Sequence, residues 1–388
     1  MPAKQYTLIF ASLLFILLGL TALFSRVVDP FWYYRDVSIV GFNAVKPKFR
    51  YYERHVKPAI LQREQPASLI FGSSFSEIGF DPLHPALAAA GKSYNFGIGG
   101  AGWEMVSCNV QFAISHDPAL RQIVLGIQPA AMPLRNCAAE IAKMEHPDER
   151  AFLLSREALE GSINTVLEQY RQKPSHTAEG MYFYTRGVSG TAGRFHEYFT
   201  RHLSCKMDHA VVVQPDSGSH IHSAASGAMH AVVDLSGLRD IVDKAVARGI
   251  AVKLVVYPRH ALSVELEYQC GIRQNRWDVL AQIASLVERD TKGLVEVWDF
   301  EGYHGIGTEI ISDAPGVYWQ DPAHFNYEFG SIMLDEMFAV KSPRIGLRIT
   351  SANLAARIGE EREARAIHIS NHPEFLRQLD NLLSHNAY

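Results

Sequence analysis

The stretch SLIFGSSFSEIGFDP, residues 68–82, begins as an apolar strand and ends as a polar turn. Gly72, Ser73, Ser74 and Ser76 fall within five residues at the point where the apolar run stops. Such a turn suits either of two structures. It can present a nucleophilic serine between a strand and a helix, or it can be a loop whose serines cap the following helix. The two structures are distinguished by whether the chain also contains residues that could activate a nucleophilic serine.

Apolar runs alternate with helical segments along most of the chain. This alternation predicts an α/β fold with a mostly parallel sheet. We expect a three-layer α/β/α sandwich of the flavodoxin-like kind, in which sites gather at the carboxyl ends of the strands. The expected sheet has five strands, at residues 67–71, 93–96, 122–127, 250–258 and 294–300.

The expected domain organisation has four segments, one of which contains an insertion. Residues 1–28 are expected to form a membrane anchor and residues 29–66 an ordered lead-in. The α/β domain is expected at residues 67–340, interrupted at about 128–229 by an insertion or lid. Residues 341–388 form a charged C-terminal tail that is helical in part.

The N-terminal run YTLIFASLLFILLGLTALF, residues 6–24, contains 19 residues and no charge. As a helix it would span roughly 28 Å, about the thickness of a bilayer's hydrocarbon core. A cleaved signal peptide usually has a shorter apolar core and a small-x-small cleavage site, and GLTALFS matches that site poorly. We therefore expect residues 6–24 to insert in the bilayer as an uncleaved anchor. Lys4 favours a cytoplasmic N-terminus, although Arg26 and Arg35 weaken that preference.

The bulk composition limits the class of partner and the compartment. The net charge of −4 and a pI near 6.5 argue against a nucleic-acid binder. We expect a single-pass protein of the inner membrane whose body faces the periplasm or the cell exterior. The cysteines permit disulfides there in three full connectivities, but four buried thiols are an equal alternative. Their spacing does not resemble a zinc site, and we expect no metal; the residues are Cys108, Cys137, Cys205 and Cys270.

The run GIGGAG, residues 97–102, satisfies the G-x-G-x-x-G pattern of dinucleotide-binding loops. It follows the second expected strand rather than the first, and Asp117, the acid nearest the required spacing, precedes a strand instead of ending one. We therefore expect no cofactor. These glycines better suit close backbone approach to a substrate, with an N–H group free to donate.

The segment YWQDPAHFN contains Asp321 three residues before His324. An aspartate at this spacing can orient an imidazole that deprotonates a serine. The same D-x-x-H pattern occurs at Asp81 and His84, only ten residues past Ser74. His324 follows the last expected strand, so the fold returns it to the same rim as Ser74, whereas His84 should point away.

Other polar and aromatic residues are weaker candidates. Arg259 could bind an anionic sugar, but we expect it to be a surface charge. His220 and His222 form an H-x-H pattern in a Ser/Gly-rich segment that suggests a loop rather than a metal site. The aromatic rings near the rim, at Trp103, Tyr318 and Trp319, are expected to pack in the core rather than stack on sugars.

Taken together, four blocks in order resemble the SGNH, or GDSL-like, hydrolase superfamily. That family has an apolar strand ending in Gly-Asp-Ser, a glycine run after the second strand, Gly-x-Asn after the third, and Asp-x-x-His near the end of the domain. The corresponding residues here are Gly72-Ser73-Ser74, Asn95 with Gly97 and Gly100, Gly126-Ile127-Gln128, and Asp321 with His324.

The resemblance implies that Ser74 is the nucleophile and that His324, oriented by Asp321, is its base. It further implies an oxyanion hole formed by the Ser74 and Gly100 N–H groups and the Gln128 side chain, and it places Asn95 of the second block beside them at the oxyanion and substrate site. Two residues depart from the family pattern. Ser73 replaces the usual aspartate, and Gln128, one methylene longer, replaces the usual asparagine.

A membrane anchor combined with divergent blocks is similar to the alginate-type acetylation proteins of this superfamily. That similarity implies O-acyl transfer, of acetyl groups in the first instance, to a cell-envelope or exopolysaccharide through an acyl-serine. The implied partners are a carbohydrate substrate and a multi-pass membrane acyltransferase. Two alternatives stay open: a carbohydrate esterase with the same triad, and a non-catalytic SGNH-like scaffold that binds polysaccharide or a membrane partner.

Overall fold

A computed structural model describes residues 3–183, 190–202, 231–289, 292–341 and 344–384. His220, His222 and Cys205 lie outside these residues. The chain forms two compact units, and each is built from two separate segments. Unit 1 comprises Met1–Glu64 and Ala138–Ala178, and unit 2 comprises Gln65–Cys137 and Glu179–Tyr388. The structure thus divides the chain differently from the expected lead-in, insertion and tail.

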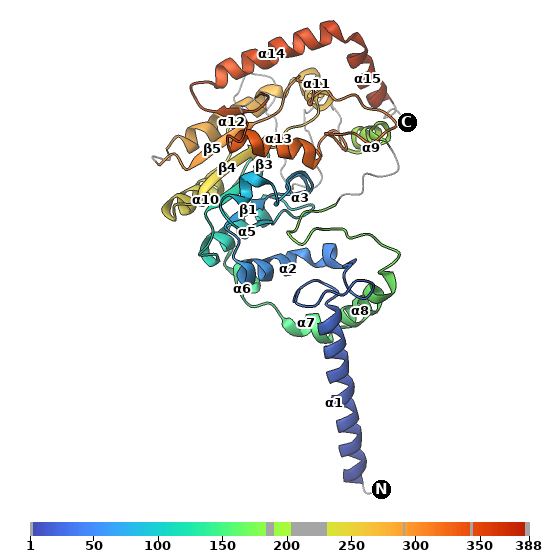
Figure 1. Cartoon of the computed structure of the whole chain (residues 1–388). Helices are drawn as coiled ribbons and strands as arrows, with labels where there is room; N and C mark the ends of the chain where they lie inside the picture. Colours follow the sequence, from blue (N-terminus) through green and yellow to red (C-terminus); the bar gives the residue numbers. More distant parts are fainter. Residues whose placement is uncertain (1–2, 184–189, 203–230, 290–291, 342–343, 385–388) are drawn as a thin grey trace. The chain divides into compact units, whose positions relative to one another are not determined.

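Unit 2 contains a six-stranded sheet with the order β2-β1-β3-β4-β5-β6. Figure 1 labels β1, β3, β4 and β5 of this sheet. The first five strands in this order run parallel, and β6 pairs antiparallel with β5. The order 2-1-3-4-5 is that of flavodoxin-like sheets, whose ligands bind where the strand order reverses, here between β1 and β3. The strands are β1 Ser68–Phe71, β2 Ser93–Asn95, β3 Gln122–Ile127, β4 Ala251–Val256, β5 Val295–Asp299 and β6 Leu347–Ile349.

The α/β class and the mostly parallel sheet are confirmed, but the sheet has six strands rather than five. The extra strand, β6, belongs to the segment 341–388 that was expected to be a tail. It is three residues long and only Ile349 is buried, so it carries no apolar run that would signal a strand. The parallel strands do carry that signal, because they are covered on both faces: all four residues of β1 are buried.

Ten helices of unit 2 are described. Among them, α3 and α5 contact β1, α10 contacts β4, and α12 contacts β5. Helix α4 is a single turn, and just before it the Asp81 carboxylate accepts the Leu83 N–H at 2.9 Å. The ten are α3 Ser74–Gly79, α4 Pro85–Ala88, α5 Trp103–His116, α9 Thr191–His202, α10 Ser236–Ala247, α11 Ala261–Gln269, α12 Arg273–Val287, α13 Tyr327–Met337, α14 Leu354–Asn371 and α15 Pro373–Ser384.

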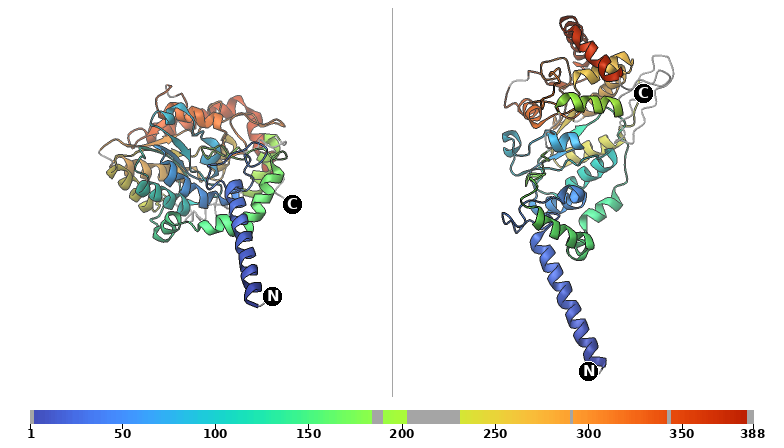
Figure 2. Two further views of the ribbon diagram at one scale, coloured as in Figure 1. Left: turned by 60° about the horizontal axis from the view of Figure 1, so that its bottom comes forward. Right: turned by 90° about the vertical axis from the view of Figure 1, so that its right-hand side faces the viewer.

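Unit 1 is helical in its described part, and its first helix is long and apolar. Helix α1 has 26 residues and a mean hydropathy of 2.5 over its best window, none of which is buried. By length and composition it is able to cross a membrane. It extends from the rest of unit 1 as one uninterrupted helix (Figure 2). The helices of this unit are α1 Ala3–Val28, α2 Phe49–Glu64, α6 Ala138–Glu145, α7 Glu149–Leu154 and α8 Arg156–Glu168.

The C-terminal end of α1 is held firmly within unit 1. Helices α7 and α8 contact α1 and lie beside its end in Figure 1. The Asp29 carboxylate accepts the N–H groups of Tyr33, Tyr34 and Arg35 at 2.7–3.0 Å. The Lys46 ammonium donates to the Asp29 carbonyl oxygen at 3.0 Å. Burial raises the pKa of Asp29, and the charge of Lys46 opposes that rise only in part.

Candidate active site

Ser74 is the first residue of α3 and follows β1 after a two-residue turn. The turn requires Gly72, whose φ of +145° is unfavourable for other residues. A Cβ at Gly72 would also collide with the Tyr257 hydroxyl and with Ser76. The Ser73 carbonyl accepts the N–H groups of Ser76 and Glu77, both at 3.0 Å, so the helix begins immediately. This strand–turn–helix arrangement presents Ser74 at the carboxyl end of β1.

Tyr257, the residue after β4, supports this turn and was not singled out by the sequence analysis. Its buried hydroxyl accepts the Ser73 N–H at 3.2 Å and lies 2.7 Å from Ser76 Oγ. Burial raises the pKa of Tyr257, so the hydroxyl stays protonated. Gly126 makes room for the ring, because a Cβ there would overlap it. A glycine inside a strand often marks such a close approach, and that signal was available at Gly126.

The structure brings Ser74, His324 and Asp321 together in one hydrogen-bonded chain. Ser74 Oγ lies 2.9 Å from His324 Nε2, and His324 Nδ1 lies 2.8 Å from Asp321 Oδ2. Since a carboxylate only accepts hydrogen bonds, we assign the imidazole proton to Nδ1. Nε2 then has a lone pair directed at the Ser74 hydroxyl. Both ring nitrogens are committed in this arrangement, which leaves neither free for a metal.

Asp321 is fixed by its own loop as well as by His324. Its Oδ1 accepts the N–H groups of Ala323 and His324 at 2.9 and 2.8 Å. Burial alone would raise the pKa of Asp321, but His324 and these hydrogen bonds lower it overall. The carboxylate is therefore charged at neutral pH, and it can stabilise a positive charge on His324.

The segment that carries Asp321 and His324 is a closed turn. Trp319 and Phe325 form an antiparallel bridge at its base, and the Gln320 N–H donates to the His324 carbonyl at 2.9 Å. The Phe75 ring stacks on the His324 ring with centroids 4.5 Å apart. These contacts fix the imidazole plane beside α3. The His324 side chain stays 23% exposed, so solvent or a substrate can reach it.

The expected oxyanion donors lie at the ends of three neighbouring strands. Ser74 follows β1, Gly100 lies in the loop after β2, and Gln128 directly follows β3. The Ile98 N–H donates to the Gly72 carbonyl at 3.1 Å, which ties the glycine loop to the Ser74 turn. Within the described residues, the Ser74 and Gly100 N–H groups and the Gln128 side chain have no hydrogen-bond acceptor or donor assigned to them.

Asn95, expected beside the substrate, is fully buried and bonds to backbone instead. Its amide donates to the carbonyl oxygens of Ser76 and Phe80 at 2.9 and 2.8 Å. Its Oδ1 accepts the Gly97 N–H at 2.8 Å. Asn95 therefore joins the glycine loop to the end of α3, and the structure places its side chain behind the site rather than in it.

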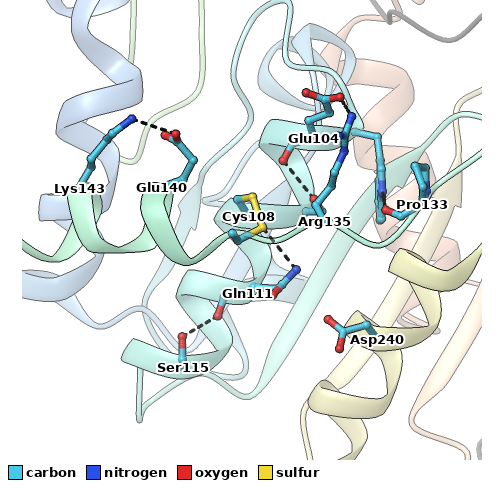
Figure 3. The surroundings of a disulfide bond; sticks show 12 residues. Glu104, Cys108, Gln111, Ser115, Pro133, Arg135, Glu140, Lys143 and Asp240 are labelled. Atoms are coloured by element: carbon cyan, nitrogen blue, oxygen red, sulfur yellow. Dashed lines mark hydrogen bonds and ion pairs between the residues drawn. A yellow bond between two sulfur atoms is a disulfide. The ribbon is translucent and has the colours of Figure 1, made fainter.

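A disulfide between Cys108 and Cys137 links α5 to the segment that follows Gln128 (Figure 3). Among the described cysteines none is a free thiol. Glu104 forms an ion pair with Arg135 in the same region. The indole N–H of Trp103 donates to the Pro133 carbonyl at 2.9 Å. These links hold the loop after β3 against the helix that follows the glycine loop.

The second D-x-x-H sequence is not part of the site. The Nδ1 of His84 accepts the Ala86 N–H and caps α4, while its Nε2 lies 3.4 Å from Asp335. Burial lowers the pKa of His84, and the residue is structural, as its position suggested. Trp319 is also in the core: its side chain is fully buried, and its indole donates to the Ile306 carbonyl.

Arg259 is not the surface charge that was expected. Its side chain is largely buried and forms ion pairs with Glu267 and Glu301. Arg273 bonds to the same two carboxylates and to Glu361. Glu267 lies on α11, and Glu301 follows β5. An anionic ligand would have to displace a carboxylate that Arg259 already holds.

Comparisons with known proteins give no match, either to a family model, to a curated protein or to a solved structure. The chemistry of this chain is therefore inferred from its own geometry.

Proposed function

We propose that unit 2 is a serine acyltransferase with an α/β/α sandwich of the SGNH type. The observation that carries the proposal is the continuous hydrogen-bonded chain from Ser74 through His324 to Asp321. Its members come from opposite ends of unit 2, 250 residues apart in the case of Ser74 and His324. The 2-1-3-4-5 order of the parallel strands supports the proposed fold, since it places Ser74 at the reversal point.

In the first half of the reaction, Ser74 Oγ attacks the carbonyl carbon of an acyl donor. His324 Nε2 takes the hydroxyl proton and Asp321 stabilises the resulting imidazolium. The tetrahedral oxyanion accepts hydrogen bonds from the N–H groups of Ser74 and Gly100 and from the Gln128 amide. Each such donor contributes about 2.7–4 kcal/mol to the transition state. The leaving group departs with the proton from His324, and an acyl-Ser74 ester remains.

In the second half, a sugar hydroxyl replaces water as the acceptor. His324 Nε2 removes its proton, the oxygen attacks acyl-Ser74, and the proton returns to Ser74 Oγ. We propose that the acceptor is a cell-envelope or exopolysaccharide and that the transferred group is acetyl. A multi-pass membrane acyltransferase is the proposed source of the acyl group, since α1 would hold the two proteins in one membrane.

We propose that α1 anchors the chain in the inner membrane with unit 2 on the periplasmic or outer side. The Cys108–Cys137 disulfide supports this side, because disulfides persist in oxidising compartments and are rare in the cytosol. The apolar composition of α1 supports the anchor.

The experiment uses the full chain in lipid nanodiscs with an alkyl fluorophosphonate, a reagent that esterifies activated serines. Mass spectrometry of the labelled peptides should place the adduct on Ser74. Ser73→Ala should keep the label, because Ser73 Oγ makes no hydrogen bond within the described residues, and Ser74→Ala and His324→Ala should lose it. An unmodified Ser74 in the wild type would overturn the proposed nucleophile.

A second assay separates transfer from hydrolysis. The same nanodiscs receive a chromogenic acetyl ester with and without an oligosaccharide acceptor. Acetylated sugar that depends on Ser74 supports transfer, and acetate without sugar product identifies an esterase. Equal turnover by wild type and Ser74→Ala would identify unit 2 as a non-catalytic scaffold.

A further inference from the structure

Helix α8 of unit 1 carries three distinct faces. Ala158, Gly161, Ser162 and Thr165 are buried. At 100° per residue these four positions lie within one sector of the helix. Their small side chains let the helix approach its neighbours closely, and a Cβ at Gly161 would lie 3.2 Å from Pro30. This face packs where α1 ends.

A second face of α8 is apolar and exposed. Its residues follow the spacing i, i+4, i+8 and i+11, which places them on one side of a helix, next to the buried sector. Their exposed fractions rise along the helix from 37% to 88%. They are Leu159, Ile163 and Leu167 of α8 and Tyr170 of the turn that follows it, and we call them the α8 apolar face. The third face is polar, with Glu157, Glu160, Asn164 and Glu168.

The α8 apolar face continues onto a nearby turn. A Cβ at Gly41 would collide with the Tyr170 hydroxyl, so the ring of Tyr170 lies against this turn. Gln169 fixes the contact by bonding to both the N–H and the carbonyl of Val45, at 2.9 and 2.8 Å. The turn presents Ile39 and Val40 to solvent, and Val40 is 92% exposed. A water-facing surface rarely gathers large apolar side chains in this way.

The position of α8 along α1 identifies what covers this face. Helix α8 packs on Pro30, six residues beyond Phe24, where the uncharged run of α1 ends. Residues 25–28 complete α1 and add roughly 6 Å of helix beyond that run. The headgroup layer on each side of a bilayer is roughly 5–8 Å thick, and amphipathic helices lie there with their apolar face in the boundary between headgroups and acyl chains. The α8 apolar face therefore lies at the depth of that boundary when α1 spans the bilayer.

We propose that the α8 apolar face, with Ile39 and Val40, seats unit 1 in the headgroup boundary of the bilayer that α1 enters. The polar face carries three glutamates, so attraction to anionic lipid contributes little and apolar contact provides the binding. Seating by α8 restricts how unit 1 can tilt, which a single spanning helix would not do. The inference requires α1 to be membrane-spanning but does not depend on the acyl-transfer chemistry.

The test places one fluorescent label at a time on an introduced cysteine in the full chain, in phosphatidylcholine nanodiscs. The described native cysteines are disulfide-bonded, and label taken up by the unsubstituted chain is subtracted. Leu167→Cys probes the α8 apolar face, and Glu157→Cys, about 80° away on the polar face of the same helix, is the matched control. Leu14→Cys, within α1, reports insertion of the anchor.

Lipids that carry a quencher near the headgroup should quench the Leu167→Cys label about twofold or more relative to the Glu157→Cys label. This difference should persist at high salt, because apolar contact is not screened. Equal quenching at the two positions would overturn the proposal. So would a Leu167→Cys label that is exposed in nanodiscs but shielded in native membranes, since a protein partner would then cover the face. A Leu14→Cys label accessible to water would overturn it as well.

Discussion

Replacing Tyr257 by phenylalanine removes one hydroxyl from beneath the turn that presents Ser74. The ring stays, so the space beside Gly72 and Gly126 remains filled and no cavity forms. Only two polar contacts are lost, at 3.2 Å to the Ser73 N–H and at 2.7 Å to Ser76 Oγ. The substitution therefore isolates what hydrogen bonding contributes to the turn.

The two contacts are not equivalent, and their difference sets the expected magnitude. Ser76 Oγ keeps a second partner, the Phe71 carbonyl at 3.0 Å, and should be little affected. The Ser73 N–H has no other acceptor among the described residues. An orphaned buried donor costs about 1–3 kcal/mol. We expect Tyr257→Phe to lower the free energy of unfolding by about that amount. Since burial raises the pKa of Tyr257, the loss should not vary with pH below neutrality.

The assay is urea unfolding of the full chain in detergent, followed by tryptophan fluorescence. Tyr170→Phe is the control, because Tyr170 is 88% exposed and should shift the free energy by less than about 0.5 kcal/mol. A double-mutant cycle with Ser76→Ala should give a coupling of about 0.5–3 kcal/mol. A Tyr257→Phe chain that unfolds like the wild type would refute the idea that this hydroxyl holds the turn.

Catalysis offers a second readout of the same substitution. If the turn relaxes, Ser74 moves relative to His324, while the residues that bind the acyl donor stay in place. We expect kcat for an acetyl ester to fall, by about tenfold for each 1.4 kcal/mol lost in the transition state, with KM nearly constant. A rise in KM alone would contradict a positioning role for Tyr257.

Three further predictions concern stability. The double variant Cys108→Ser with Cys137→Ser removes a disulfide that closes a loop across 29 residues. Chain entropy predicts that the free energy of unfolding falls by about 3.6 kcal/mol. A reductant that leaves the unfolding of the wild type unchanged would contradict this. Glu301→Gln removes one of the carboxylates that pair with buried Arg259 and Arg273, while Glu267 stays. Burial would raise the pKa of Glu301 but the arginines lower it overall, so its charge is lost in this variant. We expect a loss of about 3–5 kcal/mol in the free energy of unfolding, against almost none for exposed Glu363→Gln. Burial lowers the pKa of His260 to about 4. The unfolded chain therefore takes up this proton first, and stability should fall by up to about 3 kcal/mol as the pH drops from about 6.5 to 4. A His260→Gln chain with the same pH dependence would contradict that assignment.

The strands of unit 2 were predictable because burial on both faces leaves an uninterrupted apolar run. The run at 122–127 became β3 with the expected bounds. Strand β6 gave no such signal, since Arg348 is exposed and the strand is completed by pairing with β5. Pairing with a distant partner leaves no periodicity in a three-residue segment.

The positions of Ser74, Asp321 and His324 followed from the rule that parallel strands end at one edge. The sequence did not indicate which other residues hold these three side chains in place. The use of Tyr257 depends on a side chain crossing from β4 to β1, which only the packed structure defines. The inward direction of Asn95 likewise depends on where α3 ends.

Unit 1 was the least predictable part, because its helices come from two segments that are 73 residues apart. Helices α7 and α8 belong to a stretch that interrupts the strand pattern, and nothing in their sequence indicates that they pack on α1. Buried small residues such as Gly161 and Ser162 do not stand out from a polar surface helix.

The interleaving of the two units has a consequence for how the chain can be cut. It crosses between them three times, at residues 64–65, 137–138 and 178–179. A protease that cuts once near residue 65 would separate α1 covalently from the rest of the chain, so only the packing of residues 138–178 on residues 1–64 would still hold unit 2 to the anchor. A recombinant fragment starting after Val28 would remove the helix that α7 and α8 contact. Shedding of unit 2 by a single cleavage there therefore also requires α7 and α8 to dissociate from α1, which slows its release from the membrane.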